Sequence, residues 1–114
     1  MTFTELFKTI LTADKEASRK AAREVRKFLY SSQSDNKSRD YLDIIDTASD
    51  TYAKISEDWR QENFVTAVSV IYFLHNRENH SDFLFSWLFQ LLQHKNGNIR
   101  LAAVRMIQYE IGPL

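Results

Sequence analysis

Five basic residues in the segment 15–30 are spaced so that they share one face of a helix and could bind anions. Arg19, Lys20, Arg23, Arg26 and Lys27 lie opposite an apolar stripe made by Ala17, Ala21, Val25 and Phe28. Residues 1–30 carry seven basic and four acidic side chains, against five and nine in residues 31–80. Such a row could contact a phosphate backbone or a carboxylate-rich protein. Alternatively it is the solvated face of an amphipathic helix, partly paired with Glu16 and Glu24.

Aromatic residues form a second group with possible chemistry. Trp59 and Trp87 could form a cleft that stacks a flipped base or another planar ligand, together with Tyr52, Phe64, Phe85 and Phe89. The alternative is that these rings belong to the core, which is the usual place for aromatic residues at helical spacing.

Carboxylates and histidines give no pattern for catalysis or metal binding. Asp40, Asp43, Asp46 and Asp50 form an acidic stripe, but catalytic use would require a raised pKa or a facing partner. His75, His80 and His94 are scattered, and "HNRENH" lacks the histidine spacing of a zinc-binding helix. We therefore expect no catalytic residue, no metal site and no cofactor.

These side chains are expected to be positioned by six helices. Apolar residues recur at helical spacing in six segments, at 3–11, about 17–30, about 41 to between 56 and 59, 64–74, about 82–94 and 96–112. Thr2 is available as a cap for the first, Thr12 or Asp14 for the second, and Asn96 or Asn98 for the sixth. The polar run 31–38 is the clearest loop, and Gly112 and Pro113 form a helix stop. With two glycines and one proline, the chain has few of the turn-forming residues that β-hairpins need.

The second, fourth and sixth helices align as copies of one unit. Ala21, Ala67 and Ala102 coincide, as do Ala22, Val68 and Ala103 at the next position. One turn later the register pairs Val25 with Ile71 and Met106, and then Phe28 with Leu74 and Tyr109. The lags of 46 and 35 residues bracket the roughly 40-residue period of paired-helix solenoids.

The stretch "NGNIRLAAVRMI" resembles the second helix of HEAT repeats through Asn98, Ile99, Arg100, Ala102 and Ala103. The first copy keeps Arg19 and its alanine pair, whereas the middle copy has Val65 in place of the arginine. The resemblance, which armadillo-like pairs would share, implies an all-α domain over residues 1–114. Its three antiparallel hairpins, at about 1–31, 38–78 and 81–112, would stack as a right-handed superhelix.

The second helices of such solenoids line the concave surface, where partners bind. The resemblance therefore implies a non-catalytic binding module for a protein partner. Its candidate surface consists of Arg19, Lys20, Arg23, Arg26, Lys27, Arg60, Arg100 and Arg105. Nucleic acid is the alternative ligand, through the basic second helix.

The segment "DWRQENFVTAVSVIYFLHN" is also weakly similar to DNA-alkylation-repair glycosylases, which are HEAT-like enzymes. That family uses arginines shortly after an equivalent tryptophan and an acidic catalytic residue. Only Arg60 is basic among the residues that follow Trp59 here, and the chain is about half the expected length. Glycosylase-like activity is therefore the alternative to a binding module without catalysis.

Composition sets the remaining expectations. The absence of cysteine and of a secretory signal pattern favours a cytoplasmic protein, and the apolar run 83–92 is about half the ~20 residues of a membrane span. The last two helices are apolar almost all round, although a terminal repeat needs a polar outer face. We therefore expect self-association or further repeats at the C-terminal face.

Overall fold

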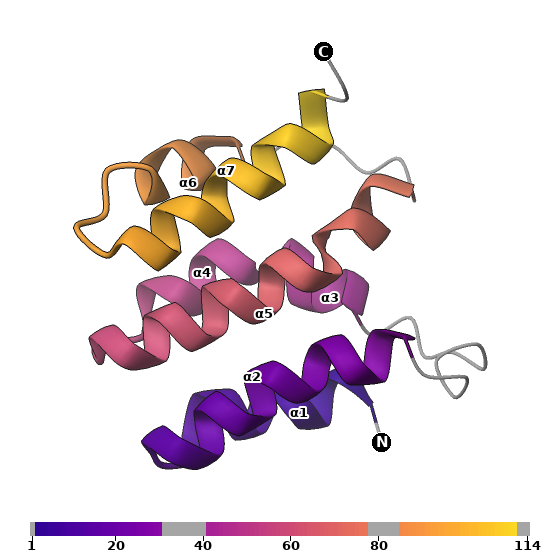
Figure 1. Cartoon of the computed structure of the whole chain (residues 1–114), viewed down its shortest axis with the longest axis vertical. Helices are drawn as coiled ribbons and strands as arrows, with labels where there is room; N and C mark the ends of the chain where they lie inside the picture. Colours follow the sequence, from indigo (N-terminus) through magenta and orange to yellow (C-terminus); the bar gives the residue numbers. More distant parts are fainter. Residues whose placement is uncertain (1, 31–40, 78–84, 112–114) are drawn as a thin grey trace.

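The chain is all-α over the residues that the structure describes, as the sequence predicts. The computed structural model describes residues 2–30, 41–77 and 85–111, with the side chains of 73–77, 85 and 109–111 left aside. Seven helices form in these residues, where six were expected (Figure 1). They are α1 (Phe3–Thr12), α2 (Lys15–Tyr30), α3 (Tyr41–Asp46), α4 (Ala48–Ala53), α5 (Asp58–Arg77), α6 (Phe85–Leu91) and α7 (Gly97–Ile111).

The first two helices begin where the capping residues predict. The Thr2 hydroxyl accepts a hydrogen bond from the backbone N–H of Glu5 at 3.1 Å and caps α1. Of the two candidates for α2, Asp14 is the cap, because its carboxylate accepts the N–H of Ala17 at 2.9 Å. A short connection at Ala13 and Asp14 turns the chain back, and α2 packs along α1.

The extra helix arises because the segment predicted as one helix, from about Tyr41 to between Ser56 and Trp59, is interrupted. The hydroxyl of Thr47 donates to the carbonyl of Asp43 at 2.8 Å, a back-bond that bends helices. Thr47 has φ −105° and ψ 9°, outside the helical range, and so separates α3 from α4. Because α4 ends at Ala53, the expected end near Trp59 is wrong, and Trp59 lies in the first turn of α5.

α6 ends earlier than its apolar pattern suggests, whereas α7 covers the expected segment as far as it is described. α6 covers Phe85–Leu91, whereas a helix over 82–94 was expected, and the first residues of that range lie outside the described part. Asn96, and not Asn98, caps α7, since its side-chain oxygen accepts the N–H groups of Asn98 and Ile99 at 2.8 and 3.3 Å. The loop 31–38 and the stop at Gly112 and Pro113 also lie outside the described residues.

The described helices form two layers. In one layer α2, α5 and α7 lie side by side, with α5 in contact with both of the others (Figure 1). Behind them α1 packs on α2, α3 and α4 pack on α5, and α6 packs on α7. None of the described helices has the length and apolar character needed to span a membrane.

Burial in the first layer follows the register in which the three helices align. Four sets of aligned residues, one residue from each of the three helices, are buried. They are Ser18/Phe64/Ile99, Ala21/Ala67/Ala102, Ala22/Val68/Ala103 and Val25/Ile71/Met106. Small residues therefore recur where neighbouring helices approach closely, and larger apolar residues follow one turn later. Equivalent positions of α2, α5 and α7 thus face equivalent directions.

Candidate binding surface

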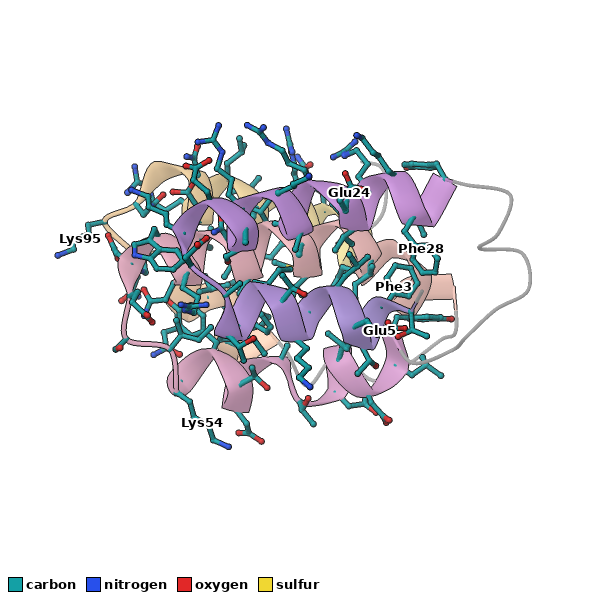
Figure 2. All side chains as sticks on the ribbon, turned by 90° about the horizontal axis from the view of Figure 1, so that it is seen from below. Phe3, Glu5, Glu24, Phe28, Lys54 and Lys95 are labelled. Carbon is teal, nitrogen blue, oxygen red and sulfur yellow. The ribbon has the colours of Figure 1, made fainter. Side chains whose placement is uncertain are left out.

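The outer side of α2 is a basic face, which we define as Arg19, Lys20, Arg23, Arg26 and Lys27. All five side chains are exposed, and Figure 2 shows nitrogen-tipped side chains along the edge of the molecule where α2 lies. Lys27 approaches Glu24 at 3.4 Å. The other four cations make no ion pair or side-chain hydrogen bond with the residues that the structure describes. Pairing with Glu16 is therefore absent from this face, and four cations remain available to a ligand.

Two hollows adjoin the basic face. One, of about 510 Å³, lies along α2 alone and includes Glu16 and Glu24 in its walls. The other, of about 440 Å³, is a groove between α2 and α5. The α2 wall of this groove consists of Arg19, Ala22, Arg23, Arg26 and Lys27, and its α5 wall of Glu62, Asn63, Thr66 and Val70. Arg19, Arg23 and Lys27 line both hollows, and of these three Arg19 and Arg23 have no ion pair among the described residues.

A polar seam joins α1, α2 and α5 beneath this groove, and we define it as Ser18, Arg60 and Asn63. The Ser18 hydroxyl donates to the carbonyl of Ile10 at 2.8 Å and accepts the side-chain N–H of Asn63 at 3.1 Å. Ser18 is fully buried, and Asn63 is 9% exposed. Buried polar groups that satisfy one another fix the relative position of the helices they join. The groove therefore has a rigid base.

Arg60 belongs to this seam and not to the exposed surface on which the sequence placed it. It is 9% exposed, and its guanidinium donates to the Ile10 carbonyl at 2.7 Å. Two further bonds reach the two carboxylate oxygens of Glu57 at 3.1 and 3.2 Å, and the guanidinium lies 4.4 Å from the centre of the Trp59 ring. The bond from Arg60 lowers the pKa of Glu57. These contacts occupy Arg60, so it is unavailable to a ligand.

Glu62, the carboxylate that lines the groove, is hydrogen-bonded by two asparagines at the start of α7. Its two oxygens accept the side-chain N–H groups of Asn96 at 2.8 Å and Asn98 at 3.2 Å. Next to it, Gln61 contacts the His94 ring at 3.2 Å. These bonds tie the start of α5 to the turn before α7. They also restrain Glu62, which keeps its charge at the end of the groove.

The two predicted arginines of α7 are exposed but lie apart from the basic face, because α5 separates α7 from α2. Arg100 donates to the carbonyl of His94 at 2.7 Å, so its guanidinium also stabilises the turn before α7. Arg105 makes no ion pair with the side chains that the structure describes. The eight predicted residues therefore divide into five on α2, two on α7 and one buried in the seam.

Among the described residues, the two tryptophans contact different partners. Trp87 is 4% exposed and packs on Tyr52, with ring centres 5.8 Å apart. Trp59 is half-buried, and the guanidinium of Arg60 covers its ring. Burial, and then the nearby charge of Asp58, raise the pKa of Tyr52. The two tryptophan rings thus have separate partners, and neither tryptophan lines the two hollows beside α2.

The predicted acidic stripe is solvated where it is described. Asp43, Asp46 and Asp50 are exposed on α3 and α4, while Asp40 lies outside the described residues. Of the histidines, His94 alone has a described side chain, and it accepts the backbone N–H of Asn96 at 2.9 Å. No group of three His, Asp or Glu side chains in the described part of the chain is placed to hold a metal ion.

Sequence reasoning missed Ser18, Asn63 and Thr66, which build the base and far wall of the groove. One signal was available. Ser18 aligns with the apolar residues Phe64 and Ile99 in the repeat register, which indicates that the Ser18 hydroxyl is buried. A buried hydroxyl needs a partner, which points to polar residues on the adjacent helix.

Comparison with protein-family models, with curated proteins and with solved structures finds no match to this chain. The resemblance to HEAT repeats therefore stays a prediction from the residues.

Proposed function

We propose that this chain is a non-catalytic binding module of the HEAT-repeat kind, and that its basic face holds the carboxylates of a protein partner. The observation that carries the proposal is a set of four cations that have no partner among the described residues, beside a groove with a rigid base. They are Arg19, Lys20, Arg23 and Arg26. Four like charges on two turns of helix repel one another. An anionic partner removes that repulsion and gains charge-assisted hydrogen bonds.

The repeat architecture is supported by burial and by helix order. Four aligned positions are buried in α2, α5 and α7 alike, and these helices contact one another in chain order. In a stack of helical hairpins that layer is the binding surface. The proposed site therefore lies where a HEAT-like module would present it.

The groove favours a protein ligand over a nucleic acid. Its α5 wall contains a carboxylate, Glu62, and an aliphatic side chain, Val70, beside the hydroxyl of Thr66. A phosphate backbone would be repelled by Glu62, whereas a peptide can place an amide or a methyl group there. Nucleic acid is accordingly the competing outcome of the test below.

The test is fluorescence anisotropy with a labelled glutamate-rich peptide and a labelled thymidine oligonucleotide, at about 50 and 200 mM salt. We expect the peptide to bind, and the double variant Arg19→Gln, Arg23→Gln to lose about tenfold or more in affinity. A variant with the same charge change, Lys54→Gln, Lys95→Gln, should bind as wild type, because these lysines lie away from α2 (Figure 2). Unchanged peptide binding by the α2 variant would contradict the proposal, and tighter binding of the oligonucleotide would favour nucleic acid.

A further inference from the structure

The layer formed by α2, α5 and α7 changes its chemistry from one edge to the other at equivalent positions. Lys20 of α2 corresponds in register to Thr66 of α5 and Leu101 of α7. One turn on, Arg23 corresponds to Ser69 and Val104. The outward positions are therefore basic on α2, hydroxylated on α5 and aliphatic on α7.

The aliphatic edge is exposed. Leu101 is 50% exposed and Val104 is 40% exposed, although the rest of the aliphatic residues described on α7 are buried or half-buried. The two arginines of α7, Arg100 and Arg105, are exposed beside them in sequence. An exposed aliphatic pair favours contact with an apolar segment, and neighbouring arginines favour a segment that also carries negative charge.

We propose that the partner is an extended protein segment that crosses the three helices, with acidic residues over α2 and large apolar residues over Leu101 and Val104. This inference rests on the proposed function and specifies its ligand. It joins two independent features, the unpaired cations and the exposed aliphatic pair, in one footprint. A nucleic acid would use the first feature but would place charge over the second.

The geometry sets the spacing of the two parts of the segment. Packed helices lie about 8–10 Å apart, so the outward positions of α2 and α7 are separated by roughly 16–20 Å. An extended chain advances about 3.3 Å per residue, so about five or six residues connect the acidic block to the apolar pair. The middle of the segment passes over Thr66, whose exposed hydroxyl can hydrogen-bond to a peptide backbone.

The test compares labelled synthetic peptides by anisotropy. The first has a block of glutamates, a spacer of about six glycine and serine residues, and a leucine pair. The second replaces the leucines with serines, and the third shortens the spacer to about two residues. We expect the first to bind about tenfold tighter than either of the others, the gain that burial of one or two half-exposed aliphatic side chains provides.

Variants separate this inference from the proposed function. Leu101→Ser, Val104→Ser should abolish the gain from the leucines and leave binding of the serine peptide unchanged, whereas Arg19→Gln, Arg23→Gln should weaken binding of all three peptides. Phe89→Ser is the matched control, because Phe89 is 53% exposed on α6, which belongs to the other layer. Thermal unfolding would establish that each variant is folded.

The outcomes are distinct. An equal gain from the leucines in the Leu101→Ser, Val104→Ser variant would overturn the proposed footprint, while the role of α2 would stand. If the α2 variant bound every peptide as wild type does, both proposals would fail. A thymidine oligonucleotide that bound more tightly than the first peptide, independently of Leu101 and Val104, would also overturn this inference.

Discussion

The polar seam and the basic face both include residues of α2, but their polar groups differ in burial and in hydrogen bonding. In the seam, Ser18, Arg60 and Asn63 are buried and hydrogen-bonded to one another or to the Ile10 carbonyl. On the basic face, whose first residue directly follows Ser18 in α2, four of five cations have no partner among the described residues. Buried polar groups without partners destabilise a fold, whereas exposed cations cost little. The seam therefore determines the structure, and the basic face is available for a ligand.

Substitution of Arg60 should have the largest effect on stability. Arg60→Met keeps an unbranched stem but removes the guanidinium and its bonds to Ile10 and Glu57, so we expect a loss of about 2–3 kcal/mol in the free energy of unfolding. Urea unfolding followed by circular dichroism measures it. Arg26→Met, on the basic face, is the matched control and should change stability by less than about 0.5 kcal/mol. Equal stability of the two variants would remove the distinction between the regions.

Ser18 and Asn63 should show a smaller, coupled effect. Ser18→Ala leaves the side-chain N–H of Asn63 without its partner, whereas Asn63→Ala removes the bond that the Ser18 hydroxyl accepts and leaves the bond that it donates to the Ile10 carbonyl. Each change should cost about 1–2 kcal/mol, and the double variant should cost less than the sum of the two, because the shared bond is lost only once. A double-mutant cycle in urea measures this coupling. Strict additivity would mean that the hydrogen bond across the helices does not stabilise the fold.

The basic face should respond in the opposite sense. Arg19→Gln and Arg23→Gln remove cations that repel their neighbours and that have no partner among the described residues. We expect each to change the free energy of unfolding by less than about 0.5 kcal/mol, in the stabilising direction if in either. Thermal unfolding of the double variant at low salt is the sensitive measurement. A destabilisation comparable to that of Ser18→Ala would show that the basic face is structural.

The sequence was sufficient for features that depend on local periodicity. The apolar stripes and the caps at Thr2 and Asp14 lie within one turn of the helix they define, and they predict α1 and α2 closely. The break at Thr47 was missed, because a threonine inside a helical pattern does not reveal whether its hydroxyl will bond to the preceding turn. The connection after α4 was also missed, because Trp59 continues the apolar spacing of that segment although it belongs to α5.

The same limit applies to the candidate site. The five basic residues of α2 were predicted correctly as an exposed face, because their exposure follows from the stripe on the opposite side of the same helix. Arg60 was assigned to that surface, but its burial depends on a carbonyl fifty positions earlier in the chain. The groove between α2 and α5 likewise requires two helices from different parts of the sequence. Contacts of this kind follow from packing and not from periodicity.

The smallest expected effect on the seam is a dependence of its stability on pH. The bond from Arg60 lowers the pKa of Glu57 below its ordinary value of 4.5, so ionised Glu57 stabilises the fold. This stabilisation is fully present above pH 4.5 and is lost as the pH falls through the lower pKa of the folded state. The stability advantage of wild type over Glu57→Gln should therefore shrink on acidification below that value, as urea titrations at a series of pH values would show. In an Arg60→Met background the pH-dependent part of the difference should largely disappear, because the bond that lowers the pKa is absent. If it persisted there unchanged, another partner of Glu57 would be responsible, and Arg60 would contribute to the seam through its bond to Ile10 alone.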